Sequence, residues 1–391
     1  MIDIDRVRSE SPACAHVIHL NNAGASLPPD VVTDAVVDYL RQEAAQGGYE
    51  VAAARASDLA NFDAATAKYL GCTPQEVAFV TSASDGWWRA FSALDIGAGD
   101  RILVGRSEFQ ANAFGWLRAQ DLGAEVTVID NDVSGTIDLQ QLSAELDERV
   151  KLVSLTMISM SNGAIHPAAE VGKVVADSSA FYLLDACQAA GQLPLDVDTL
   201  GCDALVYTGR KFMRGPRGTA TLYVREASLD HLVRPVMLDG RSAIWHDDGS
   251  YGFAPGAKRF EFGEVPYAGR VGLGVATDYM VNLGIDAIAS RIRHLSARLR
   301  SGLESIDGVR VLDEGDAKSG IVTFDADGLS CAHLQATLSK AGINVSAPGR
   351  GNAQLDLGAR GIDAVIRAGV HYYNTDAELD RLLHVVSETT A

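Results

Sequence analysis

Cysteine is scarce in this chain, and none of it is spaced as disulfides or zinc sites require. The 391 residues contain five cysteines, an odd number. They are scattered and form no CxxC pair (Cys14, Cys72, Cys187, Cys202 and Cys331). This pattern excludes a disulfide framework and a cysteine-based zinc site, and it fits a reducing compartment. We therefore expect a cytoplasmic protein without a metal site.

Positive charge is also in short supply. Lysine and arginine number 33 against 51 aspartates and glutamates, for a formal net charge of -18. A surface of this sign repels phosphate backbones, so no nucleic-acid partner is expected. No apolar run approaches the roughly 18 residues of a membrane span, and the N-terminal segment lacks an apolar signal-peptide core, so no membrane partner is expected. No P-loop and no GxGxxG turn between a strand and a helix is present, which disfavours a nicotinamide-dependent enzyme.

What the sequence does contain is a regular alternation of short apolar runs with helical patterns. Helices are predicted at 30–46 and 51–70, and strands alternating with helices follow from 77 to 224. This alternation predicts an α/β fold, with a large, mainly parallel sheet covered by helices on both faces. A long linking helix is predicted over 276–303. The expected parts are an N-terminal arm and substrate loop (1–30), a large domain (31–270), and a linking helix with a small C-terminal α+β domain (271–391).

The most informative stretch covers residues 204–222, ALVYTGRKFMRGPRGTATL. It places Lys211 just after a buried strand, flanked by Arg210 and Arg214. Burial and neighbouring cations lower the pKa of a lysine amine, and a neutral amine can form a Schiff base with pyridoxal phosphate (PLP). The alternative is an exposed lysine in a turn. We favour the cofactor because two other stretches supply the further groups that PLP needs.

Asp185 ends the apolar run FYLLD, and a carboxylate there can pair with the pyridinium nitrogen of PLP. Gln188, three residues later, can hydrogen-bond the phenolic oxygen of the ring. The alternatives are a helix N-cap for Asp185 and a solvated side chain for Gln188. Because ligands of parallel α/β sheets bind beyond the carboxyl ends of the strands, Asp185 and Lys211 are expected in one site.

The phosphate group of PLP needs an anion site, which residues 81–86 (TSASDG) can provide between a strand and a helix. Backbone amides of Ala83, Ser84 and Asp85 would bind the anion with help from the helix dipole. Asp85 is itself negative, so its side chain must point away from the phosphate. The alternative is an ordinary helix N-cap.

Three further side chains complete the predicted cofactor site. Thr208 and Arg210, beside the lysine, add a hydroxyl group and a positive charge for the phosphate. Phe109, which follows the apolar run at 101–105, is expected to stack on the cofactor ring. The alternative for Phe109 is a buried aromatic side chain that packs a loop.

With these residues in place, the chain resembles the class V aminotransferase (cysteine desulfurase-like) family of fold-type I PLP enzymes. The motifs are spread over the whole chain: HLNNAGAS, TSASDGWW, SEFQAN, LLDACQAAGQ, CDALVYTGRK, KRFEFGE, INVS and RAGVHYYNT. The resemblance implies that Lys211 binds PLP, that Arg367 binds the substrate α-carboxylate and that Asn22 borders the substrate. It also implies a homodimer with the site at the subunit interface, where Arg259 is a candidate to reach the neighbouring site.

Three positions depart from the desulfurase pattern that the resemblance implies. The loop at 346–356, SAPGRGNAQLD, lacks the nucleophilic cysteine, and Cys331 lies earlier on a predicted helix. Met160 stands where desulfurases have an asparagine, with Asn162 as a candidate substitute. Phe109 stands in place of a histidine, which removes an acid–base group. With these departures the chain resembles most the isopenicillin N epimerase-like or hercynylcysteine sulfoxide lyase-like subgroup.

We therefore expect a PLP-dependent C–S lyase that eliminates a sulfur-linked group from an S-substituted cysteine or its sulfoxide. Lys211 would take the Cα proton, and pyruvate and ammonia would be released. An amino-acid epimerase or aminotransferase of the same family is the alternative, and the missing loop cysteine disfavours a cysteine desulfurase. Intact Lys211, Asp185 and Arg367 argue against a non-catalytic binding protein.

Overall fold

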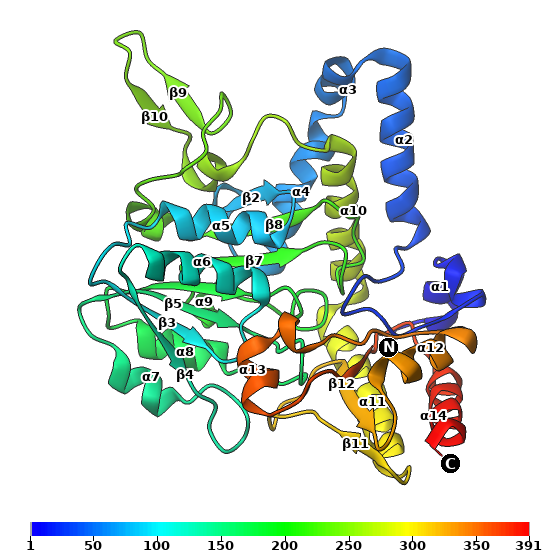
Figure 1. Cartoon of the computed structure of the whole chain (residues 1–391). Coiled ribbons are helices and arrows are strands. Elements are labelled where there is room, and N and C mark those ends of the chain that lie inside the picture. The colour runs from blue at the N-terminus through cyan, green and yellow to red at the C-terminus, as the bar shows by residue number, and fades with distance from the viewer. Residues whose placement is uncertain (1, 391) are drawn as a thin grey trace.

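A seven-stranded sheet forms the centre of the computed structural model, which describes residues 2–390 (Figure 1). Its strand order is β2-β8-β7-β6-β5-β3-β4. Strand β8 runs antiparallel to both of its neighbours, and the other pairs are parallel. The strands are β2 (Val77–Val80), β3 (Arg101–Gly105), β4 (Glu125–Ile129), β5 (Val150–Thr156), β6 (Phe181–Asp185), β7 (Ala204–Thr208) and β8 (Ala220–Val224). The expected large, mainly parallel sheet is confirmed.

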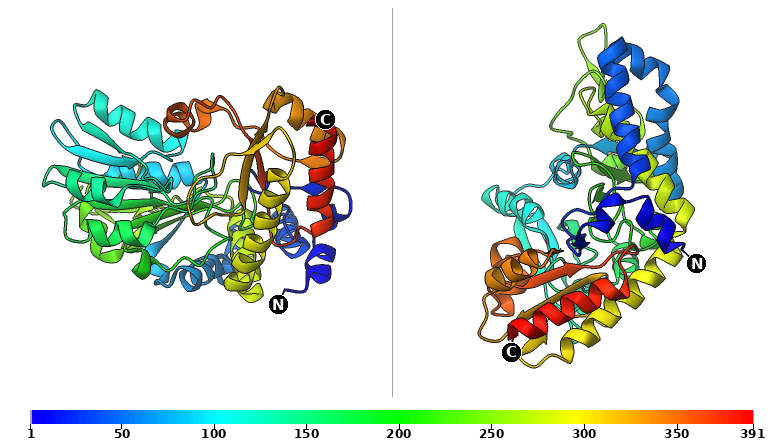
Figure 2. Two further views of the ribbon diagram at one scale, coloured as in Figure 1. Left: turned by 90° about the horizontal axis from the view of Figure 1, so that it is seen from below. Right: turned by 90° about the vertical axis from the view of Figure 1, so that its right-hand side faces the viewer.

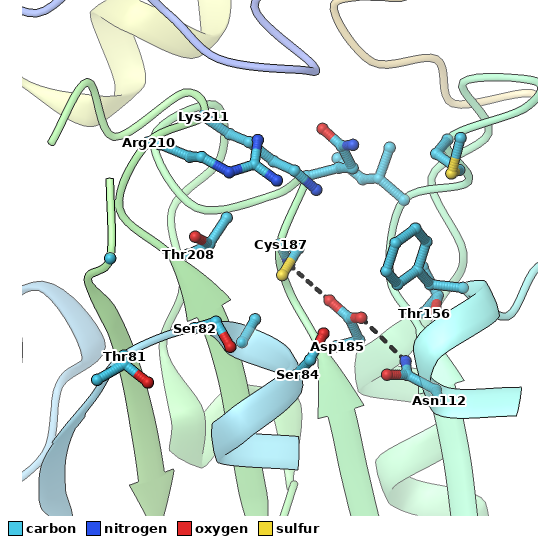
Figure 3. A pocket seen from close by; sticks show the side chains of 16 residues that line it. Thr81, Ser82, Ser84, Asn112, Thr156, Asp185, Cys187, Thr208, Arg210 and Lys211 are labelled. Carbon is cyan, nitrogen blue, oxygen red and sulfur yellow. Dashed lines mark hydrogen bonds between the residues drawn. The ribbon is translucent and has the colours of Figure 1, made fainter. Parts of the chain in front are cut away.

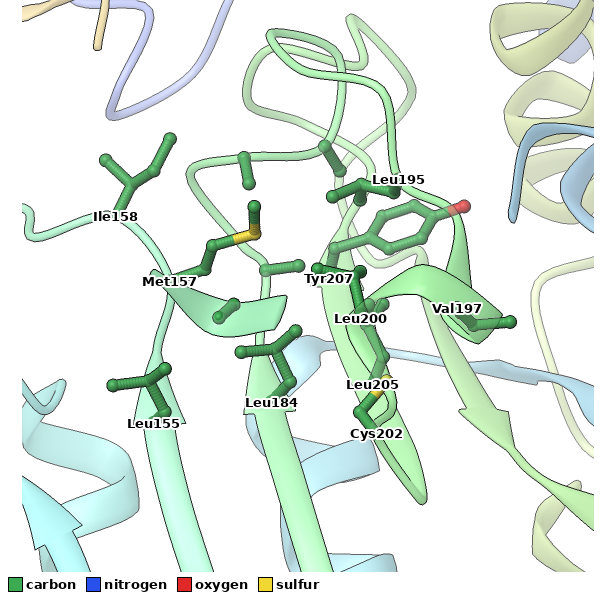
Figure 4. Close-up of a cluster of buried hydrophobic side chains, with 14 of the residues drawn as sticks. Leu155, Met157, Ile158, Leu184, Leu195, Val197, Leu200, Cys202, Leu205 and Tyr207 are labelled. Atoms are coloured by element: carbon green, nitrogen blue, oxygen red, sulfur yellow. The ribbon is translucent and has the colours of Figure 1, made fainter. Parts of the chain in front are cut away.

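Both faces of the sheet are buried, which explains why its central strands are apolar along their length. Successive side chains of a strand point to opposite faces. Leu184 and Leu205 lie in one buried cluster (Figure 4), whereas Leu183 and Val206 lie in a second cluster with Trp87. Each such side chain contributes about 1.5–3 kcal/mol when fully buried. The helices between the strands are α5 (Ala83–Ala93), α6 (Gln110–Asp121), α7 (Leu139–Glu145), α8 (Ala168–Val175) and α9 (Val197–Leu200).

Two helices that the sequence predicted as continuous are each split in two. The helix expected over 51–70 is α3 (Gly48–Ala54) and α4 (Ala56–Leu70), because Arg55 has non-helical dihedral angles (φ −109°, ψ 29°). The helix expected over 276–303 is α10 (Tyr267–Leu283) and α11 (Ile285–Glu304). Gly284 separates them with φ 88°, a backbone conformation that glycine adopts without strain. Helix α10 packs against α4 and against α2 (Asp30–Gln46), the helix that was predicted with these bounds.

The C-terminal part contains a three-stranded antiparallel sheet in the order β11-β12-β14. Its strands are β11 (Val309–Val311), β12 (Ile321–Ala326) and β14 (Ile366–Gly369). Helix α14 (Asp376–Thr390) packs against α11 and α12 (Cys331–Lys340) (Figure 2). The N-terminal segment carries α1 (Ile4–Ser9), and its β1 (Ile18–His19) pairs with β13 (Ile343–Asn344), so both ends of the chain meet here. The predicted domain boundaries at residues 30 and 270 stay predictions. Residue 270 falls inside α10 and not between two elements.

A two-stranded hairpin lies apart from both sheets. The hairpin of β9 (Ala243–Trp245) and β10 (Tyr251–Phe253) projects from the body of the molecule (Figure 1). In residues 2–390, no helix is long and apolar enough to cross a bilayer. The same residues contain no cluster of three His, Cys, Asp or Glu side chains suited to a metal ion.

Candidate active site

A pocket with about 680 Å³ of empty space opens where three neighbouring strands of the large sheet end (Figure 3). The last residues of β5, β6 and β7, which are Thr156, Asp185 and Thr208, all line it. This is the edge of a parallel sheet at which ligands bind. The remaining lining residues are Thr81, Ser82, Ala83, Ser84, Phe109, Asn112, Ile158, Met160, Cys187, Gln188, Arg210, Lys211 and Gly218. Most residues predicted to bind the cofactor therefore lie around one cavity.

Lys211 extends into this pocket from the turn that follows β7. Its Nζ atom lies 5.9 Å from the ring centroid of Phe109. Burial lowers the pKa of the Lys211 amine, and the charges of Arg210 and Arg367 lower it further, while Cys187 and Asp185 act in the opposite direction. The alternative of an exposed turn lysine is thus wrong. Arg214, expected to act on Lys211, instead bonds the Leu27 carbonyl and the Tyr372 hydroxyl on the far side of the turn.

Asp185 presents its carboxylate to the same pocket. Oδ1 accepts a hydrogen bond from the Cys187 backbone N–H (2.8 Å), and Oδ2 accepts one from Asn112 Nδ2 (3.0 Å). Gln188 is buried beside it, and its Nε2 donates to the Ala23 carbonyl (3.1 Å). Among the described residues Gln188 Oε1 has no partner. A buried amide oxygen left unbonded is destabilising by about 1–3 kcal/mol, so this atom favours a ligand with a polar group at this position.

The N-terminus of α5 lies beside the pocket, at the position predicted for the anion site. Ser82 caps the helix by accepting a hydrogen bond from the Asp85 N–H (3.0 Å), and Ala83 and Ser84 line the pocket. The Asp85 carboxylate turns away, as predicted, to Thr81 and to an ion pair with Arg89 at 2.6 Å. Backbone N–H groups at a helix N-terminus attract anions once the nearest carboxylate is neutralised in this way.

Two arginines near Lys211 have no carboxylate partner within 4 Å in the described part of the chain. The Arg210 guanidinium donates to the Gly24 carbonyl, and burial together with Arg217 lowers its pKa. Arg367, on β14, is 7% exposed and donates to Ser346 Oγ (3.1 Å) and to the Met160 carbonyl (3.5 Å). Burial and Arg210 lower the pKa of Arg367 to about 10. Buried cations are normally paired, so these two favour anionic ligands.

Arg367 is not among the residues that line the pocket, and the two other predicted substrate residues do not line it either. Asn22 uses its whole amide within the fold: Nδ2 donates to the Gly369 and His19 carbonyls, and Oδ1 accepts from the Tyr373 hydroxyl. A substrate contact through the Asn22 side chain stays a prediction, and in this structure its amide is engaged within the fold. Arg259 lies over Phe253 beside a different cavity, so contact with a neighbouring subunit remains a prediction.

The predicted substitute for the desulfurase asparagine is also absent from the pocket. Met160 lines the cavity, but Asn162 is buried elsewhere and donates to Asp356 and Glu314. Asp356, the last residue of the loop at 346–356, accepts a 2.6 Å hydrogen bond from Ser161. This loop is thereby tied to the loop that carries Met160.

Sequence reasoning missed three residues of the site. Asn112 lies one turn along α6 from Phe109 and bonds Asp185 directly. Glu108 is buried behind it, and Cys187 lines the pocket. Helical spacing did not reveal them, because Glu108 precedes the N-cap of α6 and so shares no helix face with Asn112.

Together these residues fit PLP. A lysine amine whose pKa burial lowers, a carboxylate, a helix N-terminus, the unpaired cation Arg210, an aromatic ring and an unbonded amide oxygen surround one cavity. These are the groups that bind the aldehyde, ring nitrogen, phosphate and ring face of this cofactor.

Comparison with known proteins supports the same conclusion. Residues 18–382 match the aminotransferase class-V family. The chain belongs to this family. A cysteine desulfurase of Enterobacter sp. (strain 638) is 30% identical over 400 residues, covering 97% of this chain and 96% of the relative. The structure of a cysteine desulfurase from Thermococcus onnurineus NA1 superposes with a TM-score of 0.91 at 27% identity, covering 100% and 98% of the two chains. A mutant of C-DES, solved with glycine covalently linked to the PLP cofactor, is 23% identical with a TM-score of 0.88, covering 97% and 99%, and shows the shared fold.

These findings confirm the fold type, the PLP cofactor and the enzymatic nature of the protein, and they correct the expected reaction. The relatives that align over the whole chain are named cysteine desulfurases. The expected C–S lyase is therefore wrong, and the epimerase or aminotransferase alternative fits no better. The cysteine missing from the loop at 346–356 is one local difference, whereas the similarity to cysteine desulfurases covers the whole chain.

Proposed function

We propose that this protein is a PLP-dependent enzyme that removes the sulfur atom from L-cysteine. The observation that carries the proposal is the pocket itself, which Lys211, Asp185 and Arg210 line, together with the unpaired cation Arg367, whose charge acts on the Lys211 amine. Such a pocket suits a ligand with two anionic groups, which here are the phosphate of PLP and the carboxylate of an amino acid. The names of the full-length relatives supply the substrate.

Each residue has a defined task in this proposal. PLP, when bound, withdraws electrons from the amino acid attached to it. Lys211 holds the cofactor and carries protons to and from the substrate carbons. Asp185 keeps the ring nitrogen protonated, Phe109 supports the ring face, and Arg367 orients the substrate carboxylate.

The sulfur atom needs an acceptor, and we propose that it is a thiol from outside the chain. Cys187 alone among the cysteines lines the pocket, and burial followed by the charge of Asp185 raises the pKa of its thiol, so it is a poor nucleophile. An external thiolate attacks the cysteine sulfur, an S–S bond forms, the C–S bond breaks, and the carbon takes up a proton. L-Cysteine and a thiol thus give alanine and a persulfide, and no oxidant is consumed.

Three finer points belong to the same proposal. We propose that the enzyme works as a homodimer in the cytoplasm, and that Arg259 reaches the neighbouring subunit's site. The strongly negative charge and the unpaired, scattered cysteines support a soluble protein of a reducing compartment. Phe109 and the cysteine-free loop at 346–356 support a relationship to the isopenicillin N epimerase-like or hercynylcysteine sulfoxide lyase-like subgroup.

Product analysis tests the proposed reaction. The PLP-loaded protein is incubated with L-cysteine and dithiothreitol, and alanine, sulfide and pyruvate are quantified. We expect alanine and sulfide in equal amounts, because dithiothreitol releases sulfide from the persulfide. Pyruvate in place of alanine, or no product at all, would contradict the proposal.

A further inference from the structure

A second carboxyl group lies directly behind the pocket. Glu108 immediately precedes Phe109, the N-cap of α6, and is only 4% exposed. The hydroxyl groups of Ser154 and Thr156, both on β5, lie 3.3 Å from its carboxyl oxygens. Glu108 itself does not line the pocket, so neither its burial nor its polar cage is explained by ligand contact.

Asn112 connects this carboxyl group to the cofactor site. Its Nδ2 atom lies 3.0 Å from Asp185 Oδ2 and 3.3 Å from Glu108 Oε2. Both hydrogens of one amide group are therefore directed at carboxyl groups, one on each side. The Asn112–Asp185 half of this bridge is drawn in Figure 3. At 2% exposure Asn112 has little freedom to break either contact without leaving a buried group unbonded.

The surroundings of Glu108 contain no compensating cation. The titratable groups that act on it or feel its charge are Asp185, at the end of β6, and the Tyr182 phenol, on the same strand, which donates to the Ala168 carbonyl. In the described part of the chain no lysine, arginine or histidine is among the groups that shift the pKa of Glu108. Burial, and secondly the charge of Asp185, raise the pKa of Glu108 to about 8. At neutral pH Glu108 is thus a neutral acid, and the Ser154 or Thr156 oxygen can accept its proton in a hydrogen bond.

We propose that Glu108 is a positioning residue for the cofactor: through Asn112 it fixes the Asp185 carboxylate toward the ring nitrogen, and it releases its proton when a cationic ring binds. The release of the Glu108 proton follows from charge alone. A pyridinium ion beside Asp185 attracts negative charge, so bound PLP favours the ionised form of Glu108. This inference rests on the proposed cofactor and is independent of the substrate.

Coupled binding and proton release have a measurable signature. Below the pKa of Glu108 in the bound protein, Glu108 stays protonated and binding releases no proton. Between the pKa values of the bound and the free protein, PLP binding expels a proton, and above both the carboxylate already present strengthens binding. Glu108→Gln keeps a neutral, hydrogen-bonding side chain of the same shape and cannot ionise. The ratio of the PLP dissociation constants of Glu108→Gln and wild type should therefore be near one at pH 6. It should rise by pH 9, tenfold for each pKa unit by which bound PLP lowers the pKa of Glu108.

The test is a spectroscopic titration of the cofactor-free protein with PLP from pH 6 to pH 9. Glu314→Gln is the matched control, because burial also raises the pKa of Glu314 but this residue contacts Asn162 and Arg360 and has no link to Asp185. We expect a flat ratio for Glu314→Gln and a rising one for Glu108→Gln. Asn112→Ala, which removes the bridge, should weaken PLP binding at every pH and keeps the test informative if Glu108→Gln does not fold. PLP binding with a flat Glu108→Gln ratio, or unchanged binding in Asn112→Ala, overturns this inference alone. No binding by the wild type would overturn the proposed function as well.

Discussion

Replacing Arg367 by methionine should make the cofactor-free protein more stable and the enzyme much less active. Arg367 is enclosed without a carboxylate partner, and its pKa falls from 12.5 to about 10. At about 1.4 kcal/mol per pKa unit, holding this cation in the folded state is unfavourable by roughly 3 kcal/mol. The sign follows because the lowered pKa disfavours the charged form in the folded state: the destabilisation is complete below pH 10 and disappears toward pH 12.5.

Methionine removes this destabilisation but also the hydrogen bonds to Ser346 and Met160. At about 1 kcal/mol for each bond, the net gain in the free energy of unfolding is about 1 kcal/mol at pH 7. The assay is urea unfolding of the cofactor-free protein. Arg310→Met, at a position that is 65% exposed, is the matched control, and loss of its surface ion pair should leave the free energy of unfolding little changed.

Catalytic activity should fall in Arg367→Met, although the stability of the cofactor-free protein rises. Losing a buried, charge-assisted contact with the substrate carboxylate weakens transition-state binding by about 2–5 kcal/mol, which is a fall in kcat/KM of roughly 30-fold or more. Arg367→Lys should recover part of this loss, because it keeps the charge without the planar fork. A destabilised Arg367→Met protein with wild-type kcat/KM would refute both the unpaired state of Arg367 and its role in binding substrate.

Three further outcomes are expected. Asp185→Asn, which keeps the shape but not the charge, should still bind PLP with an altered absorbance spectrum and lose about 100-fold or more in kcat; unchanged turnover would exclude Asp185 as the partner of the ring nitrogen. In the cofactor-free protein, the stability that neutral Glu108 provides is complete below pH 4.5 and is lost as pH rises to about 8. Glu108→Gln should remove this pH-dependent loss when the free energy of unfolding is measured at pH 5, 7 and 9. The same pH dependence in both proteins would refute the raised pKa. Cys331→Ser should keep the wild-type rate of alanine formation from L-cysteine, because Cys331, on α12, bonds the Ala364 carbonyl away from the pocket; a dead variant would identify Cys331 as the sulfur acceptor.

The residues of the site that could be predicted are those whose signal is local. Asp185, Thr208 and Lys211 each stand at or just after the end of an apolar run, and the edge of a parallel sheet brings such positions together. Gly284, the residue that divides the predicted linking helix, was also visible in the sequence, but a single glycine within a helical pattern does not reveal its dihedral angles.

The residues that could not be predicted depend on contacts between distant segments. The link from Glu108 through Asn112 to Asp185 exists because the start of α6 packs over the ends of β5 and β6, whose contacting residues lie 46 to 73 positions further along the chain. Asn22 was expected to border the substrate, but its amide bonds Gly369 and Tyr373, which lie 347 and 351 residues away. The reaction was mispredicted for a related reason, since the cysteine missing from 346–356 is one local difference within a chain that otherwise follows its relatives.

The position of PLP on the chain is the most direct test of the site. The PLP-loaded protein is reduced with borohydride, digested, and examined by mass spectrometry for the peptide that carries the cofactor. We expect the cofactor on Lys211 alone, and no label at any lysine after reduction of Lys211→Ala. A cofactor attached to another lysine of the wild-type protein would contradict the assignment of this pocket as the active site.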